Sequence, residues 1–179
     1  FTLPLLWLYQ SIVQQWAVSI PMTVIMIVAG FLFVSVSAYM AGLVGSSNNP
    51  VSGITISTIL FAALILVLLL GRDSSIGAVA AIMIGAVVCC AACIGGDNLQ
   101  DLKCGNIVGA TPWRQQVMLA IGAFSCALVM APVLNLLLSA YGIGERTALH
   151  PTALAAPQAT LMASVAKGIF GGNLPWGMI

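Results

Sequence analysis

Residues 41–53 read AGLVGSSNNPVSG and lie between two apolar runs, 21–40 and 54–70, each long enough to cross a bilayer. A backbone that leaves helical geometry at membrane depth cannot face lipid, because each unpaired N–H or C=O group costs several kcal/mol there. Such a backbone persists only where protein or a water-filled cavity surrounds it. Residues 41–53 are therefore the first candidate for a solute pathway.

The composition indicates the class of protein. Of the 179 residues, 61% are hydrophobic and 5% are charged, whereas soluble domains carry about 25% charged residues. This excludes an ordinary soluble fold and predicts an all-α, polytopic membrane helix bundle with a broken or re-entrant helix element, embedded in a lipid bilayer. The net charge of +1 gives no electrostatic basis for binding nucleic acid.

We expect residues 1–179 to form a single transmembrane region with four spans and one short helix. A helix of about 20 residues rises about 30 Å, the thickness of the hydrocarbon core. In the first span, Pro21 suits the first helical turn and Ser19 is the expected N-cap. The expected spans are 21–40, 54–70, 76–94 and 117–141, and the short amphipathic helix is 157–170, with polar turns at 71–75 and 142–157.

The Asn-Asn-Pro sequence in the first break has chemistry suited to a solute. Pro50 lacks an N–H group and directs Asn49 away from the α region, which leaves carbonyls free to bind a solute together with the asparagine amides. A half-helix starting after Pro50 would direct its positive dipole end at an anion. The alternative is a plain extramembrane turn, because Asn-Pro and Ser-Gly are ordinary loop dipeptides. The expected pathway residues of the break are Ser46, Ser47, Asn48, Asn49, Pro50 and Gly53.

A second group of candidates consists of charged and polar residues further along the chain. Asp97 and Asp101 are four residues apart and share one face if 97–104 is helical, so they can share a proton or contact a cation. With Lys103 they are the candidate proton-coupling or ion-contacting residues. The alternative is a solvated loop held by an Asp–Lys pair. Gln158, in the short helix, is a further candidate for the pathway.

The sequence favours neither a metal site nor an enzyme. Cys90 and Cys93 are one helical turn apart, but no matching second pair of ligands stands near them, and free cysteine packs well as a small apolar residue. We therefore expect no metal and no cofactor. We find no Ser–His–Asp set, P-loop or dinucleotide fingerprint, so no catalytic activity is expected and an ATP-driven motor is not expected in this chain.

Three stretches carry a resemblance to a known family: GLVGSSNNPVSGITIST at 42–58, GGDNLQDLKCGNIVGATPWRQQ at 95–116 and APQATLMASVAKGIFGGNLPW at 156–176. Together they resemble the oligopeptide transporter (OPT) superfamily, above all its bacterial members. The superfamily also includes the yellow stripe-like metal-chelate carriers. The resemblance implies secondary active, proton-coupled uptake of small peptides or metal–chelate complexes across the bacterial cytoplasmic (inner) membrane.

The same resemblance has consequences for the assembly. Members have more helices than this sequence can hold, so we expect it to be part of a larger transporter made of two related halves. The expected partners are the substrate, the bilayer and the remaining helices of the transporter, with a homodimer as a further alternative. The expected mechanism is alternating access around a midplane site built from the broken helix.

Two other classes stay open from the sequence. A channel is one, because an Asn-Pro break between helices is also typical of solute pores. The other is a structural membrane subunit that does not transport and whose breaks only aid packing.

Overall fold

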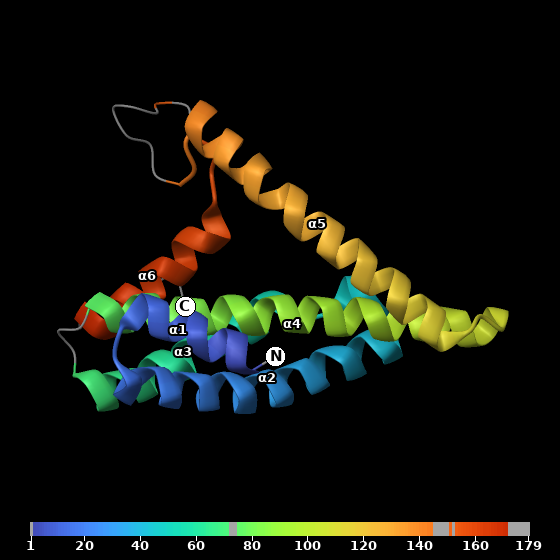
Figure 1. Ribbon diagram of the computed structural model, residues 1–179, viewed down its shortest axis with the longest axis horizontal. Coiled ribbons are helices and arrows are strands. Elements are labelled where there is room, and N and C mark those ends of the chain that lie inside the picture. Colours follow the sequence, from blue (N-terminus) through green and yellow to red (C-terminus); the bar gives the residue numbers. More distant parts are fainter. Residues whose placement is uncertain (1, 72–74, 145–150, 152, 172–179) are drawn as a thin grey trace. The chain divides into compact units, whose positions relative to one another are not determined.

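The computed structural model describes residues 2–71, 75–144, 151 and 153–171, so residues 72–74, 145–150 and 152 of the two expected polar turns lie outside this part. The secondary structure of the described part consists of helices, turns and one isolated bridge between Ile143 and Leu154. Four segments are long and apolar enough to cross a membrane, which confirms the predicted all-α polytopic bundle. In chain order, the elements are α1 (Thr2–Val13), α2 (Trp16–Val44), η1 (Ser46–Asn48), α3 (Val51–Leu70), α4 (Ser75–Val108), α5 (Pro112–Ala140) and α6 (Pro157–Gly171) (Figure 1).

The chain divides into two compact units, each described separately. The first unit comprises Phe1–Gln100 with Met162–Ile179, and the second comprises Asp101–Leu161. The boundary falls inside α4, so α1, α2, η1, α3 and most of α4 belong to the first unit.

In the first unit, α1 folds back against α2 through Gln14, which adopts a positive φ of 55° (Figure 1). The Ser19 hydroxyl is 2.9 Å from Gln10 Oε1 and 3.1 Å from the Gln15 carbonyl oxygen, and can donate to either. The expectation that Ser19 caps the first span is therefore wrong. The helix α2 begins at Trp16, and Pro21 lies inside it. The helix therefore begins five residues before the expected start at 21, and Val18 and Ser19 in this added turn are buried.

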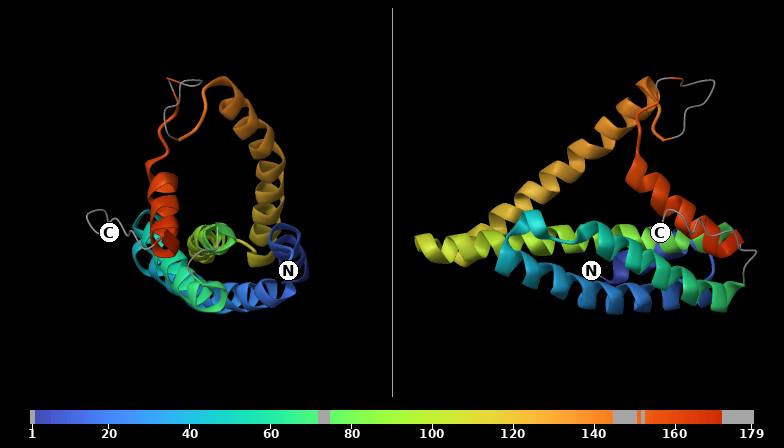
Figure 2. Two further views of the ribbon diagram at one scale, coloured as in Figure 1. Left: turned by 90° about the vertical axis from the view of Figure 1, so that its left-hand side faces the viewer. Right: turned by 180° about the vertical axis from the view of Figure 1, so that it is seen from behind.

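The inner face of α4 forms the centre of the first unit. Figures 1 and 2 show its first part lying beside α2 and α3. Small residues on α4 allow this close packing, since a Cβ at Gly85 would overlap Ile59 of α3. Five α4 residues at helical spacing are fully buried, namely Ala80, Ala81, Ile84, Val88 and Ala92.

Helix α4 is longer than the sequence pattern predicts. The expected span ended at Ile94, but the helix continues to Val108 and ends at Gly109, which has a φ of 74°. Polar residues alone do not stop a helix, whereas a glycine with positive φ does. Gly95 and Gly96 lie inside the helix, and neighbouring side chains occupy the space that a Cβ at either position would fill.

In the second unit, α5 begins at Pro112, five residues before the expected start at 117. Proline is favoured at the first helical position because its missing N–H has no partner there in any case. The helix continues through Pro132, and α5 has no buried residue. The expected short helix at 157–170 is confirmed as α6, whose first five residues belong to the second unit and whose remainder, from Met162 onwards, belongs to the first.

Candidate functional site

The predicted break between the first two spans is present. Helix α2 ends at Val44, and Gly45 turns the chain with φ 96° and ψ 160°. Asn49 has φ −68° and ψ 119°, the extended conformation that a following proline favours. Helix α3 then starts at Val51, directly after Pro50, as expected for a half-helix at this position.

The side chain of Asn49 turns towards α2 and α4. The Ser37 hydroxyl lies 2.6 Å from Asn49 Oδ1 and 2.7 Å from the Ala92 carbonyl oxygen, so its single proton can go to either acceptor. Asn49 Nδ2 donates to the same Ala92 carbonyl at 3.3 Å. Ser37 and Ala92 are buried and Asn49 is half-buried. The polar groups of this contact are thus satisfied inside the first unit.

Glycines make this contact sterically feasible. A Cβ on Gly96 of α4 would overlap the Asn49 side-chain amide, and one on Gly42 would lie 2.8 Å from Leu99 Cδ2. A Cβ on Gly95 would lie 2.9 Å from Val34 Cγ1. The end of α2 and the break therefore lie against α4 at a spacing that larger residues would prevent.

A second contact ties the start of η1 to α4. Gln100 Oε1 accepts a hydrogen bond of 2.6 Å from the backbone N–H of Ser46. Ser37, Gly96 and Gln100 were not among the site residues predicted from the sequence. The spacing of Ala92, Gly96 and Gln100 by four residues each could have placed them on one face of α4, but not against the break.

The remaining predicted residues of the break face outwards. Ser47, Asn48, Pro50 and Gly53 are exposed, and a Cβ on Gly53 would meet no atom within 4 Å. Asn48 Nδ2 donates to the Val44 carbonyl at 3.3 Å, a bond within its own turn. The break thus has an inner side held by protein and an outer side whose polar groups are exposed in the described part of the chain.

The acidic candidates lie on α4 rather than in a loop. Because the helix is continuous through 97–104, Asp97 and Asp101 stand one turn apart along it, and the loop alternative is wrong for this stretch. Both carboxylates and Lys103 are exposed. Asp97 belongs to the first unit, whereas Asp101, Lys103 and Gln158 belong to the second. The break and the latter three are therefore separate groups of candidates.

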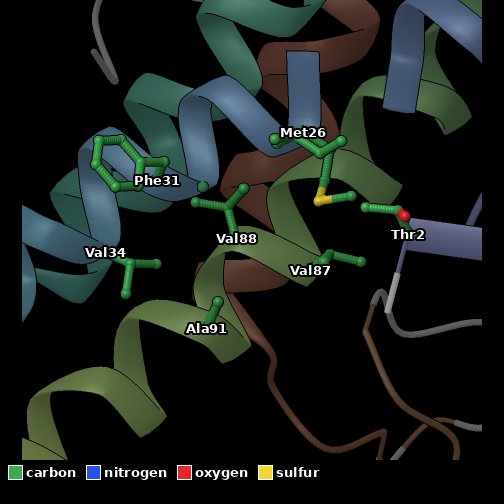
Figure 3. A pocket seen from close by; sticks show the side chains of 9 residues that line it. Thr2, Met26, Phe31, Val34, Val87, Val88 and Ala91 are labelled. Atoms are coloured by element: carbon green, nitrogen blue, oxygen red, sulfur yellow. The ribbon is translucent and has the colours of Figure 1, made fainter. Parts of the chain in front are cut away.

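Two apolar grooves lie along α4 in the first unit. One has a volume of about 330 Å³ between α1, α2 and α4 (Figure 3). The other, of about 450 Å³, lies along α1 and α4 and shares Val87 and Ala91 with the first. The described lining of the first includes one polar side chain, Thr2, among apolar residues such as Met26, Phe31, Val34, Val88 and Ala91. These grooves suit apolar groups and lack the donors and acceptors that a peptide backbone needs.

The five cysteines, all in the described part, are free thiols. Within the described residues, the histidine, cysteine and acidic side chains form no group of three suited to a metal ion. The hydrogen-bonding break is therefore the feature of the described residues best suited to a solute.

Four apolar segments long enough to span, with a polar break between the first two, define a polytopic integral membrane protein. The chain belongs to the OPT family, whose model, described as OPT oligopeptide transporter protein, matches residues 2–179. It is also 45% identical over 167 residues to a Haemophilus influenzae protein whose name provisionally describes it as an oligopeptide transporter. That match covers 86% of this chain and 26% of the relative, so the chain spans about a quarter of the relative's length. No solved structure matches the chain.

Proposed function

We propose that this chain is part of a secondary active transporter that takes up small peptides or metal–chelate complexes across the bacterial cytoplasmic membrane. The observation that carries the proposal is the break at 45–50 between two apolar helices, in a chain that belongs to the OPT family. The name of the bacterial relative, which describes oligopeptide transport, supports a peptide as the cargo. Discontinuous helices form the substrate sites of many secondary transporters, because they present free backbone groups at membrane depth.

The outer side of the break suits a peptide chemically. Ser47 and Asn48 offer a hydroxyl and an amide, and both are exposed. The Val51 N–H donates to the Asn49 carbonyl, and the N–H groups of Ser52 and Gly53 in the first turn of α3 favour a carboxylate through the helix dipole. An amide can both donate to and accept from a peptide bond. These groups would recognise the backbone and carboxy terminus of a peptide more than its side chains.

Proton coupling is assigned in this proposal to the carboxylates of α4. Asp97 and Asp101 can each carry a proton, and acidic residues near a membrane span are frequent proton-coupling groups. Lys103 provides a positive charge two positions after Asp101. In the same proposal, Gln158 is a polar residue that lines the substrate pathway. Alternating access would then expose the break to the two sides of the membrane in turn.

The partners in this proposal are the remaining helices of the transporter. The matched relative is about four times as long as the aligned stretch, since the match covers 26% of it. Helix α5 has no buried residue although it is 29 residues long and apolar. Further transmembrane helices of the same protein would supply the packing that α5 does not find within its own unit.

The direct test uses the full-length transporter in proteoliposomes, with radiolabelled trialanine and an imposed pH gradient. We expect saturable uptake that rises when the outside is acidic, and counterflow when unlabelled trialanine is trapped inside. Asp97→Asn and Asp101→Asn should reduce the response to the gradient. As a matched control, Ser125→Ala should leave uptake unchanged, because the Ser125 hydroxyl bonds to the Ile121 carbonyl of its own helix.

The outcomes of this assay separate the alternatives. Saturable uptake that ignores the gradient would refute proton coupling alone. A flux that does not saturate would indicate a channel. Transport of ferric citrate in place of trialanine would favour the metal–chelate branch of the proposal, and transport of neither would contradict the peptide and chelate assignments together.

A further inference from the structure

We propose that Asn49 and Gln100 are positioning residues, which hold the break against α4, and that Gly96 is the seat on which the Asn49 side chain rests. Because it assigns roles inside the same break, this inference rests on the proposed function. It separates the break into an inner part fixed by α4 and an outer part, Ser47 and Asn48, that meets the cargo.

The first support is the state of the Asn49 amide. Its Oδ1 lies 2.6 Å from the Ser37 hydroxyl, and its Nδ2 lies 3.3 Å from the Ala92 carbonyl oxygen. When the Ser37 hydroxyl directs its proton to Oδ1, both ends of the amide are engaged by protein groups on α2 and α4. A cargo could reach Asn49 only by replacing these partners, whereas Asn48 is exposed and, among the described residues, its side chain bonds within its own turn.

The second support is steric. Gly96 is buried, and a Cβ at this position would overlap the Asn49 amide. The amide therefore fills the space that the missing side chain leaves. An alanine here would push the Asn49 side chain away from α4 and separate it from the Ala92 carbonyl.

The third support is the second anchor point. The Ser46 N–H donates to Gln100 Oε1 at 2.6 Å, so the start of η1 is held as well as its end. Ala92, Gly96 and Gln100 follow one another at intervals of four residues, which places them on one face of α4. Residues 46–49 are therefore fixed at two points, two helical turns apart on the same helix.

A double-mutant cycle tests the inner contact. Ser37→Ala, Asn49→Ala and the double variant are compared by the melting temperature of the full-length transporter in detergent. We expect the double variant to lose clearly less than the sum of the single losses, because the two residues share one hydrogen-bond network. The control pair is Ser35→Ala with Asn49→Ala, since the Ser35 hydroxyl bonds only to Phe31 of its own helix. Additive losses for Ser37 and Asn49 would overturn the inference.

A labelling experiment tests the seat. Ser46→Cys is introduced into a full-length background without other reactive cysteines and is labelled with a membrane-impermeant maleimide. We expect Gly96→Ala to speed labelling roughly fivefold, as expected from the loss of one hydrogen bond. Gly30→Ala should leave the rate unchanged, because a Cβ there would make an ordinary contact at 4.0 Å. Equal rates in all three proteins would contradict a seat at Gly96.

Kinetics distinguish positioning from direct binding. As a positioning residue, Asn49→Ala should lower the melting temperature and the maximal rate of trialanine uptake together. A raised KM for trialanine with an unchanged melting temperature would instead make Asn49 a cargo ligand and overturn the inference. Both the melting and the labelling results can be read even if trialanine is not transported, so failure of the proposed function would be recognised separately.

Discussion

The chain contains two breaks with the same sequence pattern, a glycine followed within a few residues by a proline, but the two breaks make different contacts. The first runs from Gly45 to Pro50 and precedes α3, and the second runs from Gly109 to Pro112 and precedes α5. Both glycines have positive φ, and both following helices are apolar enough to span. The difference lies in what holds each break.

In the first break, side chains bind a helix that is not adjacent in sequence. Asn49 and the Ser46 N–H both make hydrogen bonds to α4, about 50 residues away, at separations of 43 and 54 positions. In the second break, the contacts come from its own flanks: the Ala110 N–H bonds to the Gly105 carbonyl at 2.8 Å, and Gln115 Nε2 bonds to the Asp101 carbonyl at 3.1 Å. A break held by a third helix can carry a site within the bundle, whereas one held by its own ends is an ordinary turn.

The largest difference should come from replacing the two glycines with alanine. Gly45 has φ 96° and ψ 160°, a conformation essentially restricted to glycine, so Gly45→Ala should cost about 1–3 kcal/mol. Gly109 has φ 74° at a helix end, where alanine should cost about 1 kcal/mol. Neither Cβ would meet an atom within 4 Å, so the cost is strain in the backbone alone. Thermal unfolding of the two full-length variants measures the difference, and a larger loss for Gly109→Ala would contradict it.

The two breaks also differ in how much of their structure follows from the sequence. The four spans and the break at Asn49-Pro50 follow from local rules, because apolar length and proline act on their immediate surroundings. The end of α4 at Val108 was missed because a polar stretch resembles a loop, whereas only Gly109 stops the helix. The partners of Asn49 were missed for a different reason. They depend on how α2 and α4 pack, and hydropathy carries no information on which faces meet.

A smaller difference is expected between the two glutamines that brace the breaks. Gln100→Ala removes the 2.6 Å acceptor of the Ser46 N–H and should cost about 1 kcal/mol. Gln115→Ala removes a longer, exposed bond of 3.1 Å and should cost about 0.5 kcal/mol. The Oε1 atom of Gln115 is buried and has no hydrogen-bond partner among the described residues, so its removal also relieves a desolvation cost and keeps the net loss small.

The measurement is again thermal unfolding, with Gln116→Ala as the control because its side chain is exposed. We also expect Gln100→Ala to reduce trialanine uptake and Gln115→Ala to leave it nearly unchanged, since only the first glutamine holds the candidate site. Equal effects on uptake would remove the functional distinction between the two breaks.

The smallest effect on stability should accompany a large effect on transport at Asn48. Its side chain is exposed and, in the part of the chain that the structure describes, bonds to Val44 of the same turn, so Asn48→Ala should change the free energy of unfolding by less than about 0.5 kcal/mol. If the outer side of the first break meets the cargo, the same variant should raise the KM for trialanine several-fold, because an amide that donates to and accepts from a peptide is lost. Thr111→Ala at the second break is the matched control, since Thr111 is exposed and its side chain makes no capping bond. An unchanged KM for Asn48→Ala would place the cargo elsewhere and leave the first break with a structural role only.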